Sequence, residues 1–237
     1  MTKLSVNINK IATLRNARGG NVPDLLQVAK DIQRFGGEGI TIHPRPDERH
    51  IRYQDARNLK SIVTTEYNIE GNPDRKFIDL VLEVRPTQVT LVPDAVDAIT
   101  SNAGWNTVIH KDFLTEMVQE FKRNNIRTSI FVDPTLEMIN GAAAIGAERI
   151  ELYTEAFAHQ YGLGNKNGVQ PYIHSAVLAN ELGLGINAGH DLSLENIQFF
   201  QQSIPGLLEV SIGHALISEA IYLGLENVVN MYLQKLK

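Results

Sequence analysis

The segment Gly39-Ile-Thr-Ile-His-Pro-Arg-Pro-Asp-Glu-Arg-His50 joins a short apolar run to a loop rich in histidine, proline and arginine. A short apolar run that ends abruptly in such residues is typical of a buried strand followed by a charged loop. Imidazoles exchange protons near neutral pH, and guanidinium groups bind carboxylates or phosphates through paired hydrogen bonds. The segment therefore predicts a strand whose carboxyl end carries a site for a small anion.

An alternation of strands and helices extends along the chain on both sides of this segment. The stretch Lys3–Asn9 alternates apolar and polar residues, as a half-buried strand does. Further strands are expected at 39–43, 65–70, 88–93, 127–133, 149–155, 185–190 and 207–214. Helices are expected at about 23–35, 52–63, 73–85, 111–124, 135–147, 169–182, 194–203 and from 218 onward. Strands that alternate with helices in this way are parallel, and eight such units predict a (β/α)8 TIM barrel, an α/β fold, in a single domain over residues 1–237.

An open, doubly wound sheet is the alternative fold. It is disfavoured because no Gly-x-Gly-x-x-Gly follows the first strand and because nearly every strand carries polar residues toward its carboxyl end. Two connections, 94–110 after the fourth strand and 156–168 after the sixth, are longer than the usual length of about two to six residues. We expect long loops there, either as lids over the site or as tolerated surface insertions.

The composition excludes several classes of protein. A chain of 237 residues, 43% of them apolar, can form the core of one barrel, and a net charge of −5 argues against a nucleic-acid binder. The absence of cysteine excludes disulfides, thiolate metal sites and a cysteine nucleophile. The first residues lack the apolar region of a secretory signal, and no run of about eighteen apolar residues is present. We therefore expect a soluble, cytoplasmic protein that has no membrane partner.

Polar residues gather at the expected carboxyl ends of the strands. They are Asn7, Asn9, His43, Arg45, Asn68, Glu70, Asp133, Glu151, Tyr153, Asn187, His190, Gly213 and His214. In a barrel these ends converge on one pocket. Glu70 should face the barrel mouth, where desolvation raises its pKa and suits it to act as general acid and base, unless it is a core carboxylate paired with Arg45. His43 and His190 are the other catalytic candidates, although either could be a hydrogen-bonded core residue.

The turn Ser211-Ile-Gly-His-Ala215 is a candidate phosphate site. It ends the eighth strand just before the last helix, where backbone N–H groups and the helix dipole attract anions, and Gly213 allows a close approach. Arg18, beside two glycines, and Arg45 are candidate side-chain ligands, so the site can hold two phosphates. Arg15 is expected to be a solvated loop charge. A zinc or manganese site is an alternative use of the histidines and carboxylates, but no His-x-His or His-Glu-x-x-His spacing supports it.

Five motifs resemble the pyridoxine 5'-phosphate synthase family over nearly the whole chain. They are Asn7-Ile-Asn-Lys-Ile-Ala-Thr-Leu-Arg-Asn-Ala-Arg-Gly19, Gly39-Ile-Thr-Ile-His-Pro-Arg-Pro-Asp-Glu-Arg-His-Ile51, Leu91-Val-Pro93, Asn187-Ala-Gly-His190 and Ile212-Gly-His-Ala215. The resemblance implies a transferase-class barrel enzyme of vitamin B6 biosynthesis without metal or organic cofactor. It implies condensation of 1-deoxy-D-xylulose 5-phosphate with 3-amino-2-oxopropyl phosphate to pyridoxine 5'-phosphate, phosphate and water. It also implies a homo-octamer built from four dimers.

The resemblance also assigns roles to individual residues. His43 and Glu70 match the proton acceptors and His190 the proton donor of the family. The positions that hold the deoxyxylulose phosphate are matched by Arg45, His50 and Thr100, and those that hold the amino-ketone phosphate by Asn7, Arg18, Gly213 and His214. Three further expected substrate-binding positions depart from the commonest motif: Asn9 and Lys10 stand in place of Asp and His, and Asp191 in place of Gly.

Two other functions compete with this one. The first is a phosphosugar isomerase or aldolase on the same barrel, for which Lys10 is the only lysine near a strand end. The second is a ligand-binding or scaffold protein in which His43, Glu70 and His190 are structural. Residues off the main apolar stripe of the last helix indicate a contact with another chain: Tyr222, Leu223, Met231 and Leu233.

Overall fold

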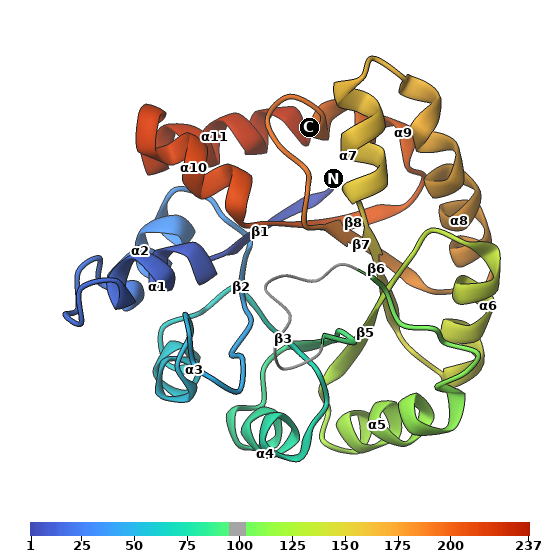
Figure 1. The fold of residues 1–237 in the computed structure, drawn as a ribbon, viewed down its shortest axis with the longest axis horizontal. Coiled ribbons are helices and arrows are strands. Elements are labelled where there is room, and N and C mark those ends of the chain that lie inside the picture. Colours follow the sequence, from blue (N-terminus) through green and yellow to red (C-terminus); the bar gives the residue numbers. More distant parts are fainter. Residues whose placement is uncertain (95–102) are drawn as a thin grey trace.

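The computed structural model describes residues 1–94 and 103–237 of the chain, and their strands form a closed parallel barrel (Figure 1). The strands are β1 (Lys3–Asn7), β2 (Gly39–Ile42), β3 (Glu66–Gly71), β4 (Gln88–Leu91), β5 (Arg127–Val132), β6 (Arg149–Tyr153), β7 (Gly185–Gly189) and β8 (Leu207–Ile212). Each strand pairs with the next in sequence, and β8 pairs with β1 to close the ring, with Ser5 opposite Ser211. The predicted (β/α)8 barrel is therefore confirmed.

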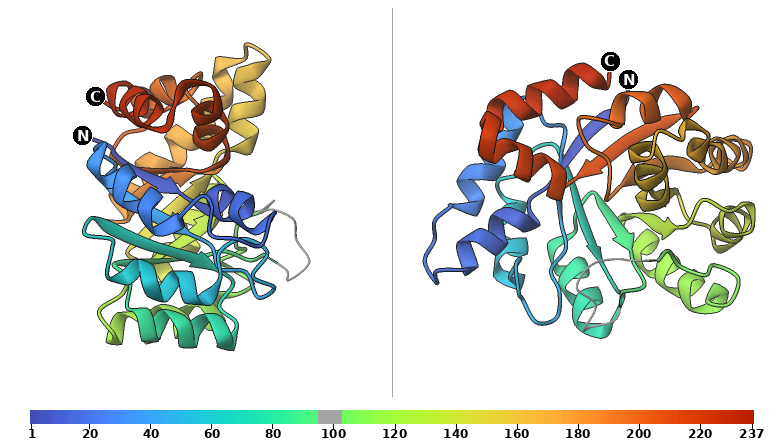
Figure 2. Two further views of the ribbon diagram at one scale, coloured as in Figure 1. Left: turned by 90° about the vertical axis from the view of Figure 1, so that its left-hand side faces the viewer. Right: turned by 45° about the horizontal axis from the view of Figure 1, so that its top comes forward.

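The helices surround this barrel (Figure 2). They are α1 (Asn9–Asn16), α2 (Leu25–Arg34), α3 (Tyr53–Lys60), α4 (Arg75–Val84), α5 (Lys111–Arg123), α6 (Leu136–Ile145), α7 (Glu155–Gly162), the 3₁₀ helix η1 (Lys166–Val169), α8 (Gln170–Glu181), α9 (Ile197–Ser203), α10 (His214–Leu223) and α11 (Leu225–Lys235). None of the helices in the described ranges is long and apolar enough to cross a membrane.

The apolar core lies between the strands and the helices. Leu4 and Val6 of β1, and Ile40 and Ile42 of β2, are fully buried on this outer side of the sheet. Burial of one such side chain contributes about 1.5–3 kcal/mol to folding. Because side chains alternate across a strand, the polar residues between them point into the barrel.

The barrel interior is polar, and hydrogen bonds connect its side chains from strand to strand. The hydroxyls of Ser5 and Thr41 are 2.7 Å apart, and Asn68 donates to Thr41 Oγ1 at 3.4 Å. Nearer the amino ends of the strands, Glu66 forms ion pairs with Arg127 and Arg149. Glu66 and Asn68 both face inward, so Glu70, two residues further along the same strand, lies on the interior face that its spacing predicted.

The first strand is shorter than predicted. It ends at Asn7, and Asn9 begins α1, a helix that the alternating pattern did not reveal. The side chain of Asn7 turns the chain at this point, because its Oδ1 accepts the N–H of Asn9 at 3.0 Å. This local side-chain bond competes with continuation of the strand.

Two later predictions also need correction. The segment 156–168 is not a plain loop, because Glu155–Gly162 forms α7 and Lys166–Val169 forms η1. The last helix is two helices: α10 begins at His214, and Gly224, with φ +83°, separates it from α11. The connection after β4 matches the prediction in the parts that are described, since residues 92–94 and 103–110 form neither helix nor strand.

Candidate active site

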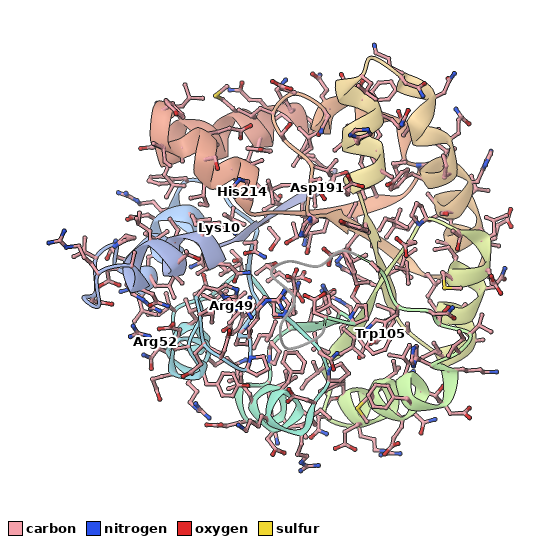
Figure 3. All side chains as sticks on the ribbon, viewed as in Figure 1. Lys10, Arg49, Arg52, Trp105, Asp191 and His214 are labelled. Atoms are coloured by element: carbon pink, nitrogen blue, oxygen red, sulfur yellow. The ribbon has the colours of Figure 1, made fainter. Side chains whose placement is uncertain are left out.

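The candidate catalytic residues lie at one rim of the barrel. His43 directly follows β2, Glu70 lies near the end of β3, and His190 directly follows β7. Since all strands of a closed parallel barrel run the same way, these carboxyl ends share a face. Figure 3 shows Lys10, His214 and Asp191 along one side of the barrel mouth, on α1, on α10 and after β7.

Hydrogen bonds of two asparagine side chains link the ends of β1, β2 and β3. Asn7 Nδ2 donates to Glu70 Oε2 at 3.3 Å. Asn9, which is tied to Asn7 by its own N–H, accepts the backbone N–H of His43 on Oδ1 at 2.9 Å. A Cβ atom at Gly213 would lie 3.1 Å from the Cβ of Asn7, so the backbone after β8 also approaches closely. The ends of β1, β2, β3 and β8 thus form one connected site.

His43 is held in its neutral form. Its side chain is buried, and burial lowers the pKa of its imidazole well below the usual value. The charge of Arg45 lowers this pKa further, followed by smaller effects that include His50 and His190. At neutral pH the ring therefore has a free electron pair and can accept a proton.

The pKa of the Glu70 carboxyl group is shifted in the opposite direction to that of His43, because it is raised. Burial raises its pKa well above the usual value, and the neighbouring carboxylates of Glu151 and Asp94 raise it further. The side chain keeps partial access to solvent and has Asn7 as its hydrogen-bond donor. A carboxyl group in this state can both give and take a proton near neutral pH.

The alternative reading of Glu70 as the partner of Arg45 is wrong. Arg45 instead forms an ion pair with Asp94 at 2.5 Å, and both side chains are 4% exposed. The guanidinium still has further N–H groups besides the one in this contact. Arg45 therefore lies beside the site without neutralising Glu70.

Glu151 is one of the strand-end residues that the sequence placed at the pocket, but the sequence assigned no role to it. It is buried in β6, and burial raises the pKa of its carboxyl group to about 7. Its Oε2 atom has no hydrogen-bond partner among the described residues, while a Cβ at Gly189 would lie 2.8 Å from Oε1. Its strand-end position predicted that it shares the pocket with Glu70, and the structure adds that its charge raises the pKa of Glu70.

A small cavity of about 140 Å³ opens between the ends of β2 and β3. Its lining includes His43, Arg45, Tyr53, Asn72, Asp74 and Asp94. The hydroxyl of Tyr53 is buried there without a hydrogen-bond partner in the described part of the chain. The cavity therefore offers both hydrogen-bond donors and hydrogen-bond acceptors beside the His43 imidazole.

His50 lies at the far end of the loop that follows β2. Its Nδ1 accepts the N–H of Ile51 at 2.9 Å, so the neutral ring carries its proton on Nε2. Burial lowers the pKa of His50 to about 4, with help from the charges of Arg45 and Lys10. His50 is therefore a neutral hydrogen-bond donor at pH 7, and Lys10 lies close enough to influence it.

The prediction that Arg15 is solvated is wrong. Arg15 is 2% exposed, and its guanidinium forms two hydrogen bonds with Asp55 and a third with the carbonyl oxygen of His50. Arg18, one turn further along, is exposed just beyond the end of α1. Of the two arginines, the first anchors the loop that carries His50, and the second is accessible to a ligand.

The candidate phosphate turn lies at the beginning of a helix. Gly213 precedes α10, whose first residue, His214, is exposed. No side chain caps this helix, so its first N–H groups are available to an anion. Lys10 is exposed on α1 rather than on a strand. Thr100 lies outside the described residues.

His190 has an unusual backbone and a charged neighbour. Its φ is +91°, a left-handed value that costs a non-glycine residue about 1–3 kcal/mol. Its Nδ1 lies 2.7 Å from Asp191 Oδ2, and its ring contacts that of Tyr153. Within residues 1–94 and 103–237, no three His, Asp or Glu side chains are arranged to hold a metal ion.

Comparison with known proteins identifies close relatives. A family model described as pyridoxal phosphate biosynthesis protein PdxJ matches residues 4–237. The pyridoxine 5'-phosphate synthases of Flavobacterium johnsoniae and Christiangramia forsetii are 81% and 68% identical to the chain, and each match covers 100% of both sequences.

Solved structures with similar folds are much more distant in sequence. Phosphoribosylanthranilate isomerase from Thermotoga maritima has a TM-score of 0.63 at 13% identity, and the match covers 100% of this chain and 98% of the other. For 3-keto-L-gulonate-6-phosphate decarboxylase from Vibrio cholerae the TM-score is 0.67 at 11% identity, over 99% and 97% of the two chains. At this sequence identity, the similarity to these structures shows a shared barrel fold and nothing more.

Proposed function

Because the chain belongs to the family of pyridoxal phosphate biosynthesis protein PdxJ, we propose that it is an enzyme that makes pyridoxine 5'-phosphate from 1-deoxy-D-xylulose 5-phosphate and 3-amino-2-oxopropyl phosphate. Phosphate and water are the other products. The observation that carries the proposal is the connection of His43, Glu70 and Gly213 through Asn7 and Asn9 at one rim of the barrel. It supports the proposal because the two candidate proton-transfer residues, His43 and Glu70, lie near the candidate phosphate turn.

In the proposed reaction, the amine of one substrate condenses with the ketone of the other to give an imine and water. His43, neutral because it is buried, or Glu70 takes the proton whose removal converts the imine to an enamine. Loss of water and of phosphate follows, and His190 gives the proton that the departing phosphate oxygen takes. Water then adds to the resulting electrophile, and the carbon skeleton of the intermediate closes onto the remaining carbonyl. A final dehydration gives the aromatic ring.

The two substrate phosphates occupy different parts of the rim in this proposal. Arg45, His50 and Thr100 hold the deoxyxylulose phosphate, and the neutral Nε2–H donor of His50 suits that task. The amino-ketone phosphate is held by Asn7, Arg18, Gly213 and His214. Asn9 and Lys10 add a hydrogen-bonding group and a cation nearby, and Asp191 lies against His190 at the same rim.

The competing aldolase needs a lysine that forms a Schiff base. Such a lysine is usually desolvated, which lowers its pKa and frees its amine. Lys10 is exposed on α1, which disfavours that role. Borohydride trapping with either substrate, followed by mass mapping, distinguishes the two functions, because only the aldolase leaves an adduct on Lys10.

The proposal extends to the molecule as a whole. In this proposal the enzyme uses no metal or organic cofactor. It is located in the cytoplasm and assembles as a homo-octamer of four dimers. Exposed apolar side chains on α10 support a contact between copies, since Ile221 is 76% and Tyr222 is 88% exposed. No nucleic acid or membrane takes part.

Incubation of the protein with both phosphorylated substrates tests the proposed function. The expected result is the absorbance of pyridoxine 5'-phosphate and an equal amount of released phosphate, with neither product when one substrate is omitted. Folded protein that yields no product would remove the assignment and favour a binding or scaffold protein. Mass spectrometry of the product separates this reaction from simple isomerisation of one sugar phosphate.

A further inference from the structure

The carboxylate of Asp191 is aimed at one nitrogen of the His190 ring. Asp191 Oδ2 is 2.7 Å from His190 Nδ1, and the two side chains are 30% and 31% exposed at the rim of the barrel. An ionised carboxylate only accepts hydrogen bonds, so the proton in this contact belongs to Nδ1. The contact therefore selects Nε2 as the nitrogen that exchanges a proton with substrate.

Thr154 holds the backbone on both sides of His190. This residue follows β6 and is fully buried. Its hydroxyl donates to the carbonyl oxygen of Gly189 at 2.6 Å and accepts the N–H of Asp191 at 3.1 Å. The peptide groups that flank His190 are thereby fixed to a neighbouring strand.

The two hydrogen bonds of Thr154 explain how His190 keeps a left-handed backbone. A non-glycine residue with φ of +91° persists only where its surroundings determine it. Besides Thr154, the side chain of Asn196 donates to the carbonyl oxygen of Asp191 at 3.4 Å. The Tyr153 ring meets the imidazole edge-on, with the ring centres 5.4 Å apart. Backbone and ring are each held by separate groups.

We infer that Asp191 and Thr154 are positioning residues for His190: Thr154 fixes its backbone, and Asp191 keeps a proton on Nδ1 so that Nε2 carries out the transfer. The inference rests on the proposed function, in which His190 is the proton donor. The carboxylate of a Ser-His-Asp triad orients its imidazole in the same way.

The doubly protonated His190 ring bonds Asp191 through Nδ1–H and gives the proton on Nε2 to the phosphate oxygen. The C–O bond to that oxygen breaks, and its electron pair leaves with the phosphate. The ring remains neutral with its proton on Nδ1. Asp191 accepts the Nδ1–H hydrogen bond throughout and is not consumed.

The first test is direct and independent of catalysis. Nitrogen NMR of protein labelled in its histidines, assigned with His190→Gln, reports which nitrogen of the neutral ring carries the proton. We expect Nδ1–H in the wild type, and Nε2–H in Asp191→Ala and in the isosteric Asp191→Asn, whose amide can turn its NH2 group toward Nδ1. A wild-type ring with its proton on Nε2 would overturn the inference.

The second test separates positioning from substrate binding. We expect kcat to fall at least about tenfold in Asp191→Asn and in Thr154→Val, with the KM of both substrates within about threefold of wild type. Asp191→Glu should restore part of kcat and the Nδ1–H signal. Glu195→Gln, an exposed change in the same loop, is the control and should match wild type. A raised KM with unchanged kcat would contradict the inference and return Asp191 to substrate binding.

Failure of the inference is distinguishable from failure of the proposed function. If the wild type makes no product, the proposed function is wrong, and the NMR measurement still decides whether Asp191 sets the proton position. If product forms and Asp191→Asn keeps both wild-type kcat and Nδ1–H, only the inference is wrong.

Discussion

The guanidinium of Arg15 meets the carboxylate of Asp55 through two hydrogen bonds, at 2.7 and 2.8 Å. Arg15 is 2% exposed, and the same guanidinium donates to the carbonyl oxygen of His50 at 3.1 Å. Asp55 also accepts the N–H of Arg52 at the start of α3. One ion pair thus connects α1, the loop that carries His50 and α3.

Removal of the Arg15 charge should destabilise the protein strongly. Arg15→Met leaves the Asp55 carboxylate largely buried without its cation, which costs about 3–5 kcal/mol of unfolding free energy. Urea unfolding followed by circular dichroism measures this cost. Arg75→Ala is the matched control, because its pair with Asp79 is 81% and 54% exposed and should change little. Equal effects of the two substitutions would contradict the structural role of the Arg15 pair.

Replacement of the Glu70 carboxyl group should stop proton transfer while the fold remains. Glu70→Gln keeps the shape and the contact with Asn7 but cannot exchange a proton. We expect kcat to fall by about a hundredfold or more, with KM little changed. Steady-state kinetics provides the measurement, and Glu116→Gln on the exposed face of α5 is the control. Unchanged turnover would make Glu70 a structural residue.

The buried carboxyl groups should make the protein less stable as pH rises from 6.5 to 8. Burial raises the pKa of Glu209 to about 7 and that of Glu151 to about 7, above the usual value of 4.5 that applies in the unfolded chain. The stability contributed by each raised pKa is complete below pH 4.5 and is lost as pH rises through 7. His43 and His50, whose pKa values are lowered, contribute the opposite slope only below about pH 6.5.

Glu209→Gln isolates one of these groups. The variant cannot ionise at this position, so its unfolding free energy should fall less between pH 6.5 and 8 than that of the wild type, by about 1 kcal/mol. Urea unfolding at the two pH values gives the difference. Parallel slopes for wild type and variant would show that Glu209 titrates normally in the folded protein.

A methyl group at residue 213 should weaken phosphate binding. In Gly213→Ala the new Cβ lies 3.1 Å from the Cβ of Asn7 and occupies the space before α10. We expect KM for 3-amino-2-oxopropyl phosphate to rise about tenfold, with a smaller effect on the other substrate. Gly162→Ala, where nothing lies within 4 Å of the added atom, should match wild type. An unchanged KM would show that the phosphate does not bind at this turn.

A charge on α10 should disturb the proposed assembly. Tyr222→Glu places a carboxylate among the exposed apolar side chains of that helix. We expect light scattering to report a smaller mass than that of the wild type, because burial of an unpaired charge in an interface is costly. An unchanged mass would place the contact between copies on another surface.

The barrel and most of its strand ends could be predicted from the chain alone. Periodicity is a local property, so the strands around Val6, Ile40 and Ile186 were evident without any knowledge of their neighbours. Once eight units were counted, the common rim of His43, Glu70 and His190 followed from the parallel direction of the strands. Local signals failed where a single side chain redirected the backbone, as Asn7 does before α1.

The sequence by itself determined the fold, the polar strand ends and the family, because these depend on patterns within short segments and on their order. Only the tertiary structure decided that Arg15 is buried against Asp55, that Arg45 pairs with Asp94 rather than Glu70, and that Asp191 faces the His190 ring. The two arginine pairs join residues 40 and 49 positions apart. Partners at such separations are set by the closure and register of the barrel, and burial and pKa follow from those partners.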